Sequence, residues 1–503
     1  MTSSKAPESA GPASEAPLDV AVIGAGFGGL CMAIHLERAG LRYVVLEQAT
    51  RLGGTWRDNH YPGAACDVPS NLYCLSFEPN PDWSRVYPAQ AEIETYMNRC
   101  ADKYGVRHAM RFGTRVTAAR YDERAAIWRI ATHGGDEIAA RVVVSATGGL
   151  SRPAMPNIEG LDGYRGALFH SARWNHGFDL IGKTVAVIGT GASAIQIVPE
   201  IAPSVARLLV FQRTPAWIIP RDDRPRTEAE RARYRKHPWT QKLSRLATYA
   251  RFEARALGFT KAPGLLRIAE RQVRRYIAHK IPDPVLREKL TPKYTLGCKR
   301  VLSSNDFYPA LRRENVALIT DRIARATSVG LVTADGTEHG VDAIIAATGF
   351  HAAEAGSPFP VYGLGGRELN EAWRDGAQAY LGTTIAGFPN HFLITGPNTG
   401  LGHNSMIYII ESQITYIMRT IDALRARSAA AFDVRPEIQA VYNAEIQARL
   451  AHTVWNTGGC RSWYLTRDGR NTTLWPGFTF EFRRRTKRFH PGDYRVVSPA
   501  TAA

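Results

Sequence analysis

Two glycine-rich loops in this sequence have the spacing of dinucleotide-binding sites. In the first loop, Gly24, Gly26, Phe27 and Gly29 follow the apolar run LDVAVI and open a helical pattern. Glycine permits the tight turn and the close backbone approach to a pyrophosphate, whose charge rests on the helix N-terminus. Glu47 ends the next apolar strand, where a carboxylate can accept from both ribose hydroxyls. This loop therefore predicts a dinucleotide whose adenosine ribose carries no 2′-phosphate.

The second loop differs from the first in the charge that follows it. After another apolar strand the chain runs through Gly189, Thr190, Gly191, Ala192, Ser193 and Ala194. The next strand ends in Gln212, Arg213 and Thr214, without an acid. An acid would repel a 2′-phosphate, whereas Arg213 would pair with it and Thr214 could donate to it. The second nucleotide is therefore predicted to be NADP, and the two sites together indicate FAD and NADPH.

Each loop belongs to a strand–helix–strand unit of about 30 residues, beginning at residues 18 and 183. The predicted fold class is therefore α/β, with two Rossmann-like dinucleotide-binding domains. Two more apolar strands end in Ala146-Thr147-Gly148 and Ala347-Thr348-Gly349. A strand end made of small residues and glycine lets the chain pass close to a cofactor or cross between domains.

The order of these elements predicts a discontinuous domain organisation. Residues 18–150 and 343–503 are expected to form the FAD-binding domain, and residues 151–342 the NADP-binding domain. A region rich in Arg, Ala, Leu and Glu at about 222–296 is expected to be a helical insertion in the second domain. Residues 1–17 contain Ser, Ala and Pro without an apolar segment, which predicts a disordered tail.

Composition excludes several other classes of protein. No apolar run approaches the ~20 residues of a membrane span, so we expect a cytoplasmic protein without a transmembrane segment. The six cysteines include no C-x-x-C pair and no zinc-finger spacing, so we expect free thiols and no metal site. The net charge of +17 could attract nucleic acid or an anionic membrane, but no nucleic-acid-binding motif accompanies it. A solvated arginine-rich surface is therefore the favoured interpretation.

A third pattern precedes the second loop: Tyr164-x-Gly166-x-x-x-His170-x-x-x-Trp174. It resembles the fingerprint of the Baeyer–Villiger monooxygenases, Phe-x-Gly-x-x-x-His-x-x-x-Trp followed by Pro or Asp. Tyr164 replaces the Phe, and Asn175 replaces the Pro or Asp. The Trp favours this family over the related flavin-containing monooxygenases that oxidise nitrogen and sulfur, which have an aromatic residue followed by Lys.

Longer segments resemble the same family over residues 18–490. They are GGTWRDNHYPGAACD (53–67), YTLGCKRVLSSNDFYPAL (294–311) and GTTIAGFPNHFLITGPNTGLGHNSM (382–406). The resemblance implies that NADPH reduces FAD and that reduced FAD reacts with O2 to a C4a-peroxyflavin. The deprotonated peroxide then attacks a ketone, and rearrangement gives an ester or a lactone.

The resemblance also implies a role for each matching residue. Arg300 matches the catalytic arginine that stabilises the negative peroxyflavin and the developing oxyanion, and Asp67 matches the carboxylate that positions it. His170 is implied to organise the junction between domains rather than to act as a base. The FAD contacts implied are Gly54, Thr55, Trp56, Asp67 and Tyr73. The implied NADP contacts, besides those named above, are Ala65, Cys66, Asp67, Gln196 and Lys299. Trp455, Trp463 and Tyr464 either line the ketone pocket or belong to the core.

Two alternative functions stay open at this point. A flavin-containing monooxygenase of the same architecture would oxidise an amine or a thioether through the protonated peroxide, whereas Arg300 favours the anion. A non-catalytic protein, either a flavoprotein redox sensor or a nucleic-acid binder, is the more remote alternative, because both loops and the active-site segment are intact.

Overall fold

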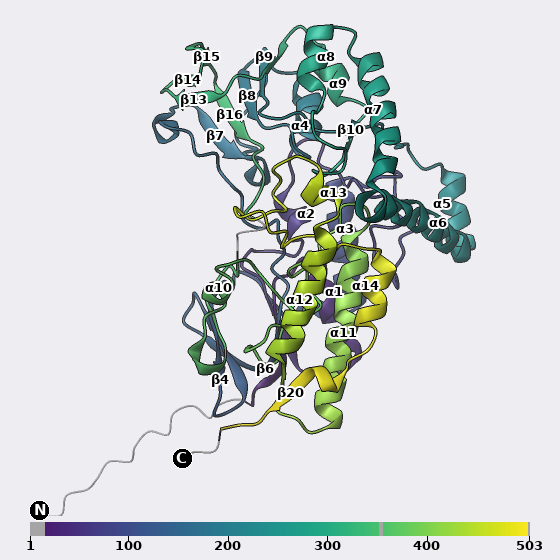
Figure 1. The fold of residues 1–503 in the computed structure, drawn as a ribbon, viewed down its shortest axis with the longest axis vertical. Helices are drawn as coiled ribbons and strands as arrows, with labels where there is room; N and C mark the ends of the chain where they lie inside the picture. Colours follow the sequence, from purple (N-terminus) through teal and green to yellow (C-terminus); the bar gives the residue numbers. More distant parts are fainter. Residues whose placement is uncertain (1–15, 352–355, 501–503) are drawn as a thin grey trace, which may run out of the picture.

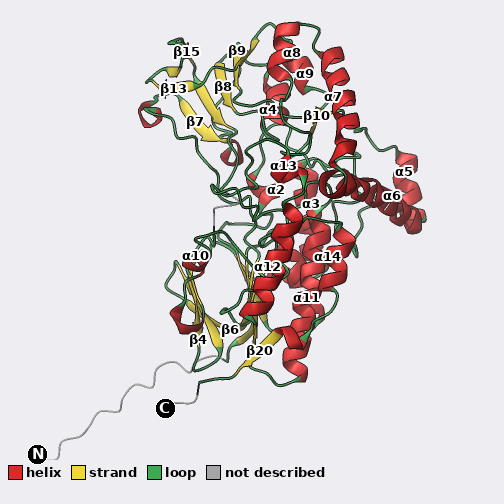
Figure 2. Cartoon of the chain, viewed as in Figure 1, coloured by secondary structure: helices red, strands yellow, loops and turns green. Residues whose placement is uncertain are grey.

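The computed structural model describes residues 16–351 and 356–500, which form two α/β domains, one above the other in Figures 1 and 2. The expected tail at 1–17 lies almost entirely outside the described residues. Among the helices of the described ranges, none is both long enough and apolar enough to cross a membrane.

The first domain is built on a sheet with the strand order β17-β4-β5-β6-β1-β2-β3, in which β18 also pairs with β6. Its central strands run parallel, and their apolar stretches Val20–Ile23, Tyr43–Leu46 and Val142–Val144 are buried, as expected for strands covered on both faces. The strands are β1 (Leu18–Ile23), β2 (Tyr43–Leu46), β3 (Met110–Arg111), β4 (Val116–Asp122), β5 (Ile127–Thr132), β6 (Glu137–Ser145), β17 (Val361–Tyr362) and β18 (His391–Leu393).

Helices cover this sheet, and α1 packs against the long helix α11 (Figure 1). The longer helices are α1 (Phe27–Arg38), α3 (Gln90–Lys103), α11 (Met406–Ala426), α12 (Pro436–Leu450) and α14 (Thr479–Thr486). The short ones are α2 (Thr55–Asp58), α10 (Leu369–Ala372) and α13 (Val454–Thr457). A small antiparallel pair, β19 (Ala431–Val434) and β20 (Tyr494–Val497), joins the end of the chain to this domain.

The second domain is built on a parallel sheet with the order β12-β9-β8-β16-β7. Its strands are β7 (Ala167–His170), β8 (Thr184–Ile188), β9 (Arg207–Phe211), β12 (Val316–Ile319) and β16 (Ala343–Ala346). An antiparallel sheet, β13 (Ile323–Ala326), β14 (Gly330–Thr333) and β15 (Glu338–Gly340), precedes β16. The boundary expected after residue 342 is wrong, because β16 pairs with both β7 and β8 and so belongs to the second domain.

The chain crosses between the domains after β6 and again after β16, and the two crossing segments lie side by side. Ala154 N donates to Gly349 O at 2.9 Å, and Thr348 Oγ1 donates to Ala154 O at 2.5 Å. Pro153 and Phe350 form an antiparallel bridge. The Ala-Thr-Gly strand ends therefore lie at the junction, as their composition predicts.

Helices fill the range expected for the insertion. They are α5 (Glu228–Lys236), α6 (Pro238–Ala256), a π-helical turn (Leu257–Lys261), α7 (Leu266–Lys280) and α8 (Pro284–Leu290). Flanking this range, β10 (Ile218–Ile219) pairs with β11 (Leu302–Ser303). Helix α5 begins with a capping box in which Thr227 and Glu230 bond reciprocally. Helices α4 (Ala194–Ile201) and α9 (Phe307–Leu311) lie in the same domain and pack together.

The expectation that every cysteine is a free thiol is wrong. Cys298 and Cys460 form a disulfide, whereas Cys31, Cys66, Cys74 and Cys100 are free and buried. The paired cysteines are 162 residues apart, so local spacing could not reveal them. They meet because the segment before Arg300 packs against the loop after α13, where Thr295 N donates to Gly458 O at 3.0 Å.

This pairing predicts the number of reactive thiols in the unfolded protein. Without reductant, a thiol reagent should titrate four cysteines, and after reduction it should titrate six. A Cys460→Ser variant should titrate one thiol more than the unreduced wild type, because Cys298 loses its partner. Six reactive thiols in the unreduced wild type would show that the pair is not formed in solution.

Candidate active site

The first glycine loop forms a cradle that side chains could not occupy. Gly24 has a φ of 104°, and a Cβ there would lie 2.6 Å from Ala146 O. A Cβ on Gly54 would lie 2.8 Å from Gly26 Cα, so the two backbones approach closely. Helix α1 begins at Phe27 with no side-chain cap and no acid in its first turn. Its first N–H groups therefore suit an anion, and the loop fits a pyrophosphate.

Glu47 lies at the end of β2 and is 5% exposed. Its Oε2 accepts from Ala25 N at 2.8 Å, and its Oε1 accepts from Ala49 N at 2.9 Å. Arg57 Nη1 lies 3.0 Å from Oε1, so the buried Glu47 side chain has a cationic partner. Glu47 is thus fixed where a ribose would bind. Arg57 was not predicted, because nothing in the sequence distinguishes a buried arginine from a solvated one.

Three predicted flavin contacts form an aromatic cluster beside the first loop. The rings of Phe27 and Tyr73 meet edge to face with their centroids 5.5 Å apart. Trp56 Nε1 donates to Tyr73 OH at 3.0 Å, and burial raises the pKa of the Tyr73 hydroxyl. Thr55 begins α2 directly after Gly54. The cluster joins the start of α1 to the 53–67 segment and gives the cofactor cradle a rigid apolar side.

The second loop repeats the geometry of the first. Gly189 has a φ of 112°, and a Cβ there would lie 2.5 Å from Ala347 O. Gly191 and Ala192 are exposed, Ser193 is half-buried, and Ala194 is buried at the start of α4. Each Ala-Thr-Gly strand end thus begins with an alanine whose carbonyl lies against the first glycine of a nucleotide loop.

Two cations lie together at the end of β9. Arg213 is exposed, and Lys299 is half-buried, with its Nζ 5.3 Å from the centroid of the Tyr294 ring. Burial lowers the pKa of the Lys299 ammonium, and the nearby charge of Arg213 lowers it further. Thr190 Oγ1 donates to Thr214 O at 3.3 Å, which holds Thr214 beside the loop. A bound anion would relieve the repulsion between the cations, so the place fits a 2′-phosphate.

The 61–67 segment runs along α4 and connects the two nucleotide loops. Tyr61 OH donates to Gln196 Oε1 at 2.9 Å, and Gln196 Nε2 donates to Ala65 O at 3.0 Å. Arg221 Nη2 donates to Cys66 O at 2.7 Å. Gln196, Ala65 and Cys66 therefore lie together, as the resemblance implies. Arg221 is a contact that the sequence did not predict, since it lies 155 residues from its partner.

Arg300 and Asp67 meet where this segment ends. Arg300 Nε and Nη2 both donate to Asp67 Oδ2, at 2.8 and 2.7 Å, and Nη1 donates to Leu401 O at 3.2 Å. Each side chain is about a third exposed. The charge of Asp67 raises the pKa of the Arg300 guanidinium, so it stays cationic. The pair brings together three segments that resemble the family: 53–67, 294–311 and 382–406.

Of the aromatic residues expected near the ketone, Tyr464 lies within range of the charges of both Arg300 and Asp67. It is 1% exposed, and its hydroxyl lacks a hydrogen-bond partner among the described residues. Burial raises its pKa to about 12, although the charge of Arg300 opposes the shift. Trp455 is buried and packs against Phe259, whereas Trp463 is 47% exposed. A buried hydroxyl without a partner points to a ligand site.

Among the fingerprint residues, His170 contacts a segment that crosses between the domains, and the other three contact residues of the second domain. His170 Nδ1 accepts from Ala172 N at 3.1 Å, and its Nε2 lies 3.0 Å from Gly349 O, so both ring nitrogens contact the backbone. Burial lowers the pKa of His170. Tyr164 OH donates to Val341 O at 2.8 Å. Two further members pack closely, since a Cβ on Gly166 would lie 2.7 Å from Asp342 O and Trp174 meets Phe169 edge to face.

Glu253 of α6 forms a buried network that sequence reasoning missed. Its carboxylate accepts from Thr479 N at 2.5 Å, Thr479 Oγ1 at 2.8 Å and Asn404 Nδ2 at 2.6 Å, and His403 Nε2 lies 3.7 Å away. Burial opposes ionisation, but the nearby His403 ring and the hydrogen bonds from Thr479 and Asn404 outweigh it and lower the pKa of Glu253. The network connects α6 to the 382–406 segment and to α14.

Replacing Glu253 with Gln should lower the free energy of unfolding by about 2–4 kcal/mol, because one amide cannot accept all of these bonds. The pKa of Glu253 is depressed in the folded protein, so its contribution is present at neutral pH and is lost as the pH falls through that pKa. Chemical denaturation measures the change. Glu437→Gln, at an exposed position of α12, is the matched control, and equal stability of both variants would contradict the role.

The fold and the site together define a class of protein. Two Rossmann-like domains place their glycine loops on either side of a junction, and the Arg300–Asp67 pair lies where the segments that connect them meet. This arrangement is that of an oxidoreductase with one flavin and one nicotinamide nucleotide.

Comparison with known proteins shows the family. A family model described as pyridine nucleotide-disulphide oxidoreductase matches residues 21–228. A Baeyer–Villiger monooxygenase of Pseudomonas aeruginosa is 47% identical over 98% of this chain and 94% of its own length. Another, of Streptomyces coelicolor, is 50% identical over 96% of this chain and 93% of its own. The chain belongs to the Baeyer–Villiger monooxygenase family.

Solved structures agree with this family. A steroid monooxygenase bound to NADP superposes with a TM-score of 0.86 at 33% identity, covering 96% of this chain and 100% of its own. Cyclohexanone monooxygenase from Rhodococcus sp. Phi1, bound to NADP+, superposes with a TM-score of 0.85 at 29% identity, covering 96% and 100%. The predicted fold class and family are confirmed.

Proposed function

We propose that this chain is an FAD- and NADPH-dependent Baeyer–Villiger monooxygenase that uses O2 to insert one oxygen atom next to a ketone carbonyl, giving an ester or a lactone. The observation that carries the proposal is the Arg300–Asp67 pair at the junction of the two nucleotide domains. Homologues with FAD and NADP in their structures support both cofactors.

The residues that would hold each cofactor follow from the geometry. The cradle of Gly24, Gly26 and Gly54 and the carboxylate of Glu47 would hold FAD, and Arg213 and Lys299 would hold the 2′-phosphate of NADPH. FAD, once reduced by NADPH, supplies the activation of O2. The protein contributes binding, orientation and charge.

Arg300 would stabilise the negative charge that develops on oxygen during ketone oxidation. Asp67 engages Nε and Nη2 through one oxygen, so further N–H groups of the guanidinium stay available to a ligand. Because the charge of Asp67 raises the pKa of the Arg300 guanidinium, this group remains charged during the reaction. A fixed cation in a partly enclosed site stabilises developing negative charge more strongly than a cation in water does. It also needs no reorganisation during the reaction.

His170 would act as a positioning residue. Its Nε2 contacts the crossing segment at Gly349, its Nδ1 contacts the backbone at Ala172, and burial lowers its pKa and so favours the neutral form. It can therefore fix the angle between the domains without transferring a proton.

We place the reaction in the cytoplasm, which supplies NADPH. Structural disulfides are rare in that compartment. Detection of the Cys298–Cys460 pair by the thiol titration would therefore count against this placement.

The test is which substrates the enzyme converts to product. Flavin-loaded enzyme with NADPH should convert linear, cyclic or aryl ketones in a mixed panel to esters or lactones, as identified by gas chromatography with mass detection. Oxidation of thioethers or amines in the panel, with every ketone unchanged, would support a flavin-containing monooxygenase in place of this function.

A further inference from the structure

The outward face of α6 carries a stripe of apolar side chains. Trp239, Leu243 and Leu246 are 61%, 55% and 61% exposed, and Leu257, directly after the helix, is 41% exposed. Their successive spacings of four, three and eleven residues put them on one face. The exposed alanines in the same stripe are Ala247, Ala250 and Ala254. Contiguous exposed apolar surface of this kind marks an interaction site.

The opposite face of α6 fixes the orientation of the stripe. Gln241 Nε2 donates to Asn80 O at 2.6 Å, and Arg245 Nη1 donates to Asn71 O at 2.9 Å. Phe252 is 3% exposed. Turning the stripe inward would break these bonds and expose Phe252. The stripe is therefore a permanent feature of the surface.

The helices around the stripe are strongly basic. Between residues 228 and 280 the chain has fourteen Lys and Arg against four Glu and no Asp. All four Glu are engaged, two by arginines, one in the buried network and one by a backbone N–H: Glu228, Glu230, Glu253 and Glu270. Lys236 and Lys242 are exposed beside the stripe. The field around the apolar side chains is therefore positive.

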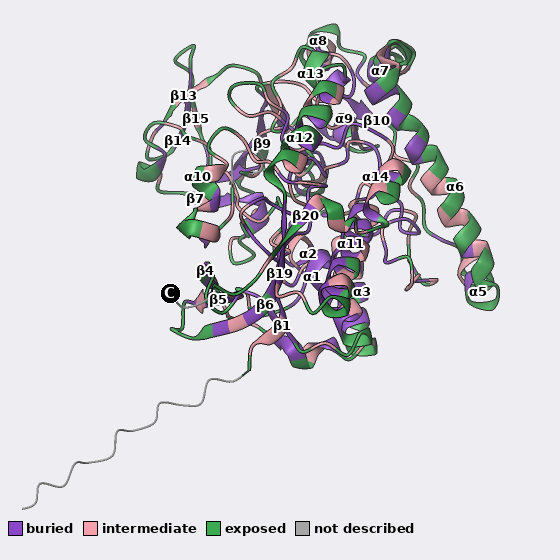
Figure 3. Ribbon diagram, turned by 60° about the horizontal axis from the view of Figure 1, so that its bottom comes forward, coloured by how far each residue is buried: buried purple, intermediate pink, exposed green. Residues whose placement is uncertain are grey.

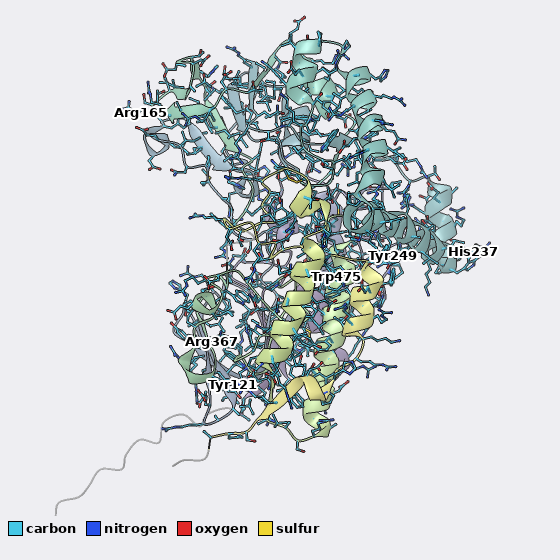
Figure 4. The ribbon with its side chains drawn as sticks, in the orientation of Figure 1. Tyr121, Arg165, His237, Tyr249, Arg367 and Trp475 are labelled. Atoms are coloured by element: carbon cyan, nitrogen blue, oxygen red, sulfur yellow. A yellow bond between two sulfur atoms is a disulfide. The ribbon has the colours of Figure 1, made fainter. Side chains whose placement is uncertain are left out.

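Helices α5 and α6 also extend away from the two sheets, at the right of Figure 1. Figure 4 labels His237 at the outer end of α6 and Tyr249 nearer the body of the protein. Figure 3 shows exposed and half-buried residues along most of α6. The stripe thus lies on a projecting part of the molecule that a flat surface can reach.

We propose that α6 binds an anionic lipid surface, with Trp239, Leu243 and Leu246 inserted at the level of the headgroups. Apolar side chains with an aromatic residue among them, surrounded by Lys and Arg, are the features of a helix that lies in a membrane interface. A second copy of this chain would bring one basic face against another, which charge repulsion disfavours. Nucleic acid would use the cations but not the apolar stripe. Lipid binding is independent of the chemistry at Arg300.

The test is cosedimentation of the full, flavin-loaded protein with vesicles. Vesicles of phosphatidylcholine with about one third phosphatidylglycerol should pellet the wild type, and pure phosphatidylcholine should pellet it weakly. The double variant Leu243→Gln/Leu246→Gln should bind the anionic vesicles at least about tenfold more weakly, because binding needs both the inserted apolar side chains and the attraction between the cations and the anionic lipid. Raising the salt to about 0.5 M should weaken wild-type binding by screening the cations.

The matched control is Val441→Gln, which changes a side chain 71% exposed on α12, and it should bind as the wild type does. Thermal unfolding checks that each variant is folded. Equal binding of the wild type and the double variant, or absence of binding to anionic vesicles, would overturn the proposal. A dimer in vesicle-free solution that the double variant dissociates would also overturn it, because a second copy would then occupy the stripe.

Discussion

Replacing Arg300 with Ala is expected to lower kcat for ketone oxidation by about 10²–10³-fold or more, because the site loses its fixed cation. Asp67 would also lose the partner that it contacts at 2.7–2.8 Å, so an uncompensated carboxylate would oppose negative charge on the substrate. NADPH should still bleach the bound flavin at a rate within about threefold of the wild type, since the nucleotide contacts remain.

Stopped-flow absorbance without oxygen measures the bleaching, and product analysis in air measures ketone oxidation. Arg312→Ala is the control, because Arg312 is an exposed residue of the same domain, and both rates should stay unchanged. If the Arg300→Ala variant lost flavin bleaching, and ester formation fell by the same factor as the bleaching rate, Arg300 would instead act in nucleotide binding.

Replacing Arg213 with Ala should raise the KM for NADPH by about 10- to 100-fold, the value of a charge-assisted hydrogen bond to a phosphate. The KM for NADH should change by less than about threefold, because NADH lacks the 2′-phosphate. Lys299 should then show a higher pKa, since Arg213 is one cause of its depression. Initial rates with each nucleotide give the comparison.

Arg207→Ala provides the matched control, because Arg207 is exposed at the start of β9 and Arg213 follows the end of that strand. It should leave both KM values unchanged. An equal loss of affinity for NADH and NADPH in Arg213→Ala would mean that Arg213 supports the loop rather than the phosphate.

Both nucleotide loops could be predicted from the sequence because their chemistry is local. Gly24 and Gly189 lie in short contiguous patterns between a strand and a helix, and the structure gives both of them positive φ angles. The Ala-Thr-Gly strand ends were also predictable, since Ala146 and Ala347 follow apolar strands that parallel pairing places beside those loops.

Features that depend on distant pairing could not be predicted in this way. The Cys298–Cys460 disulfide and the contacts of Glu253 join segments more than a hundred residues apart, and neither has a local pattern. The boundary near residue 342 was misplaced because the next strand is equally apolar in either domain, and its pairing with β8 decides the assignment. Arg300 was identified through the surrounding 294–311 segment, and its role in catalysis stays a prediction.

The central claim is that one atom of O2 enters a ketone, and product mass after reaction with ¹⁸O-labelled dioxygen tests it most directly. Flavin-loaded enzyme, NADPH, labelled dioxygen and a ketone that it accepts should give an ester or a lactone one labelled oxygen heavier than the ketone. An unlabelled ester, or NADPH consumed only to form hydrogen peroxide with every ketone in the panel, would contradict the account.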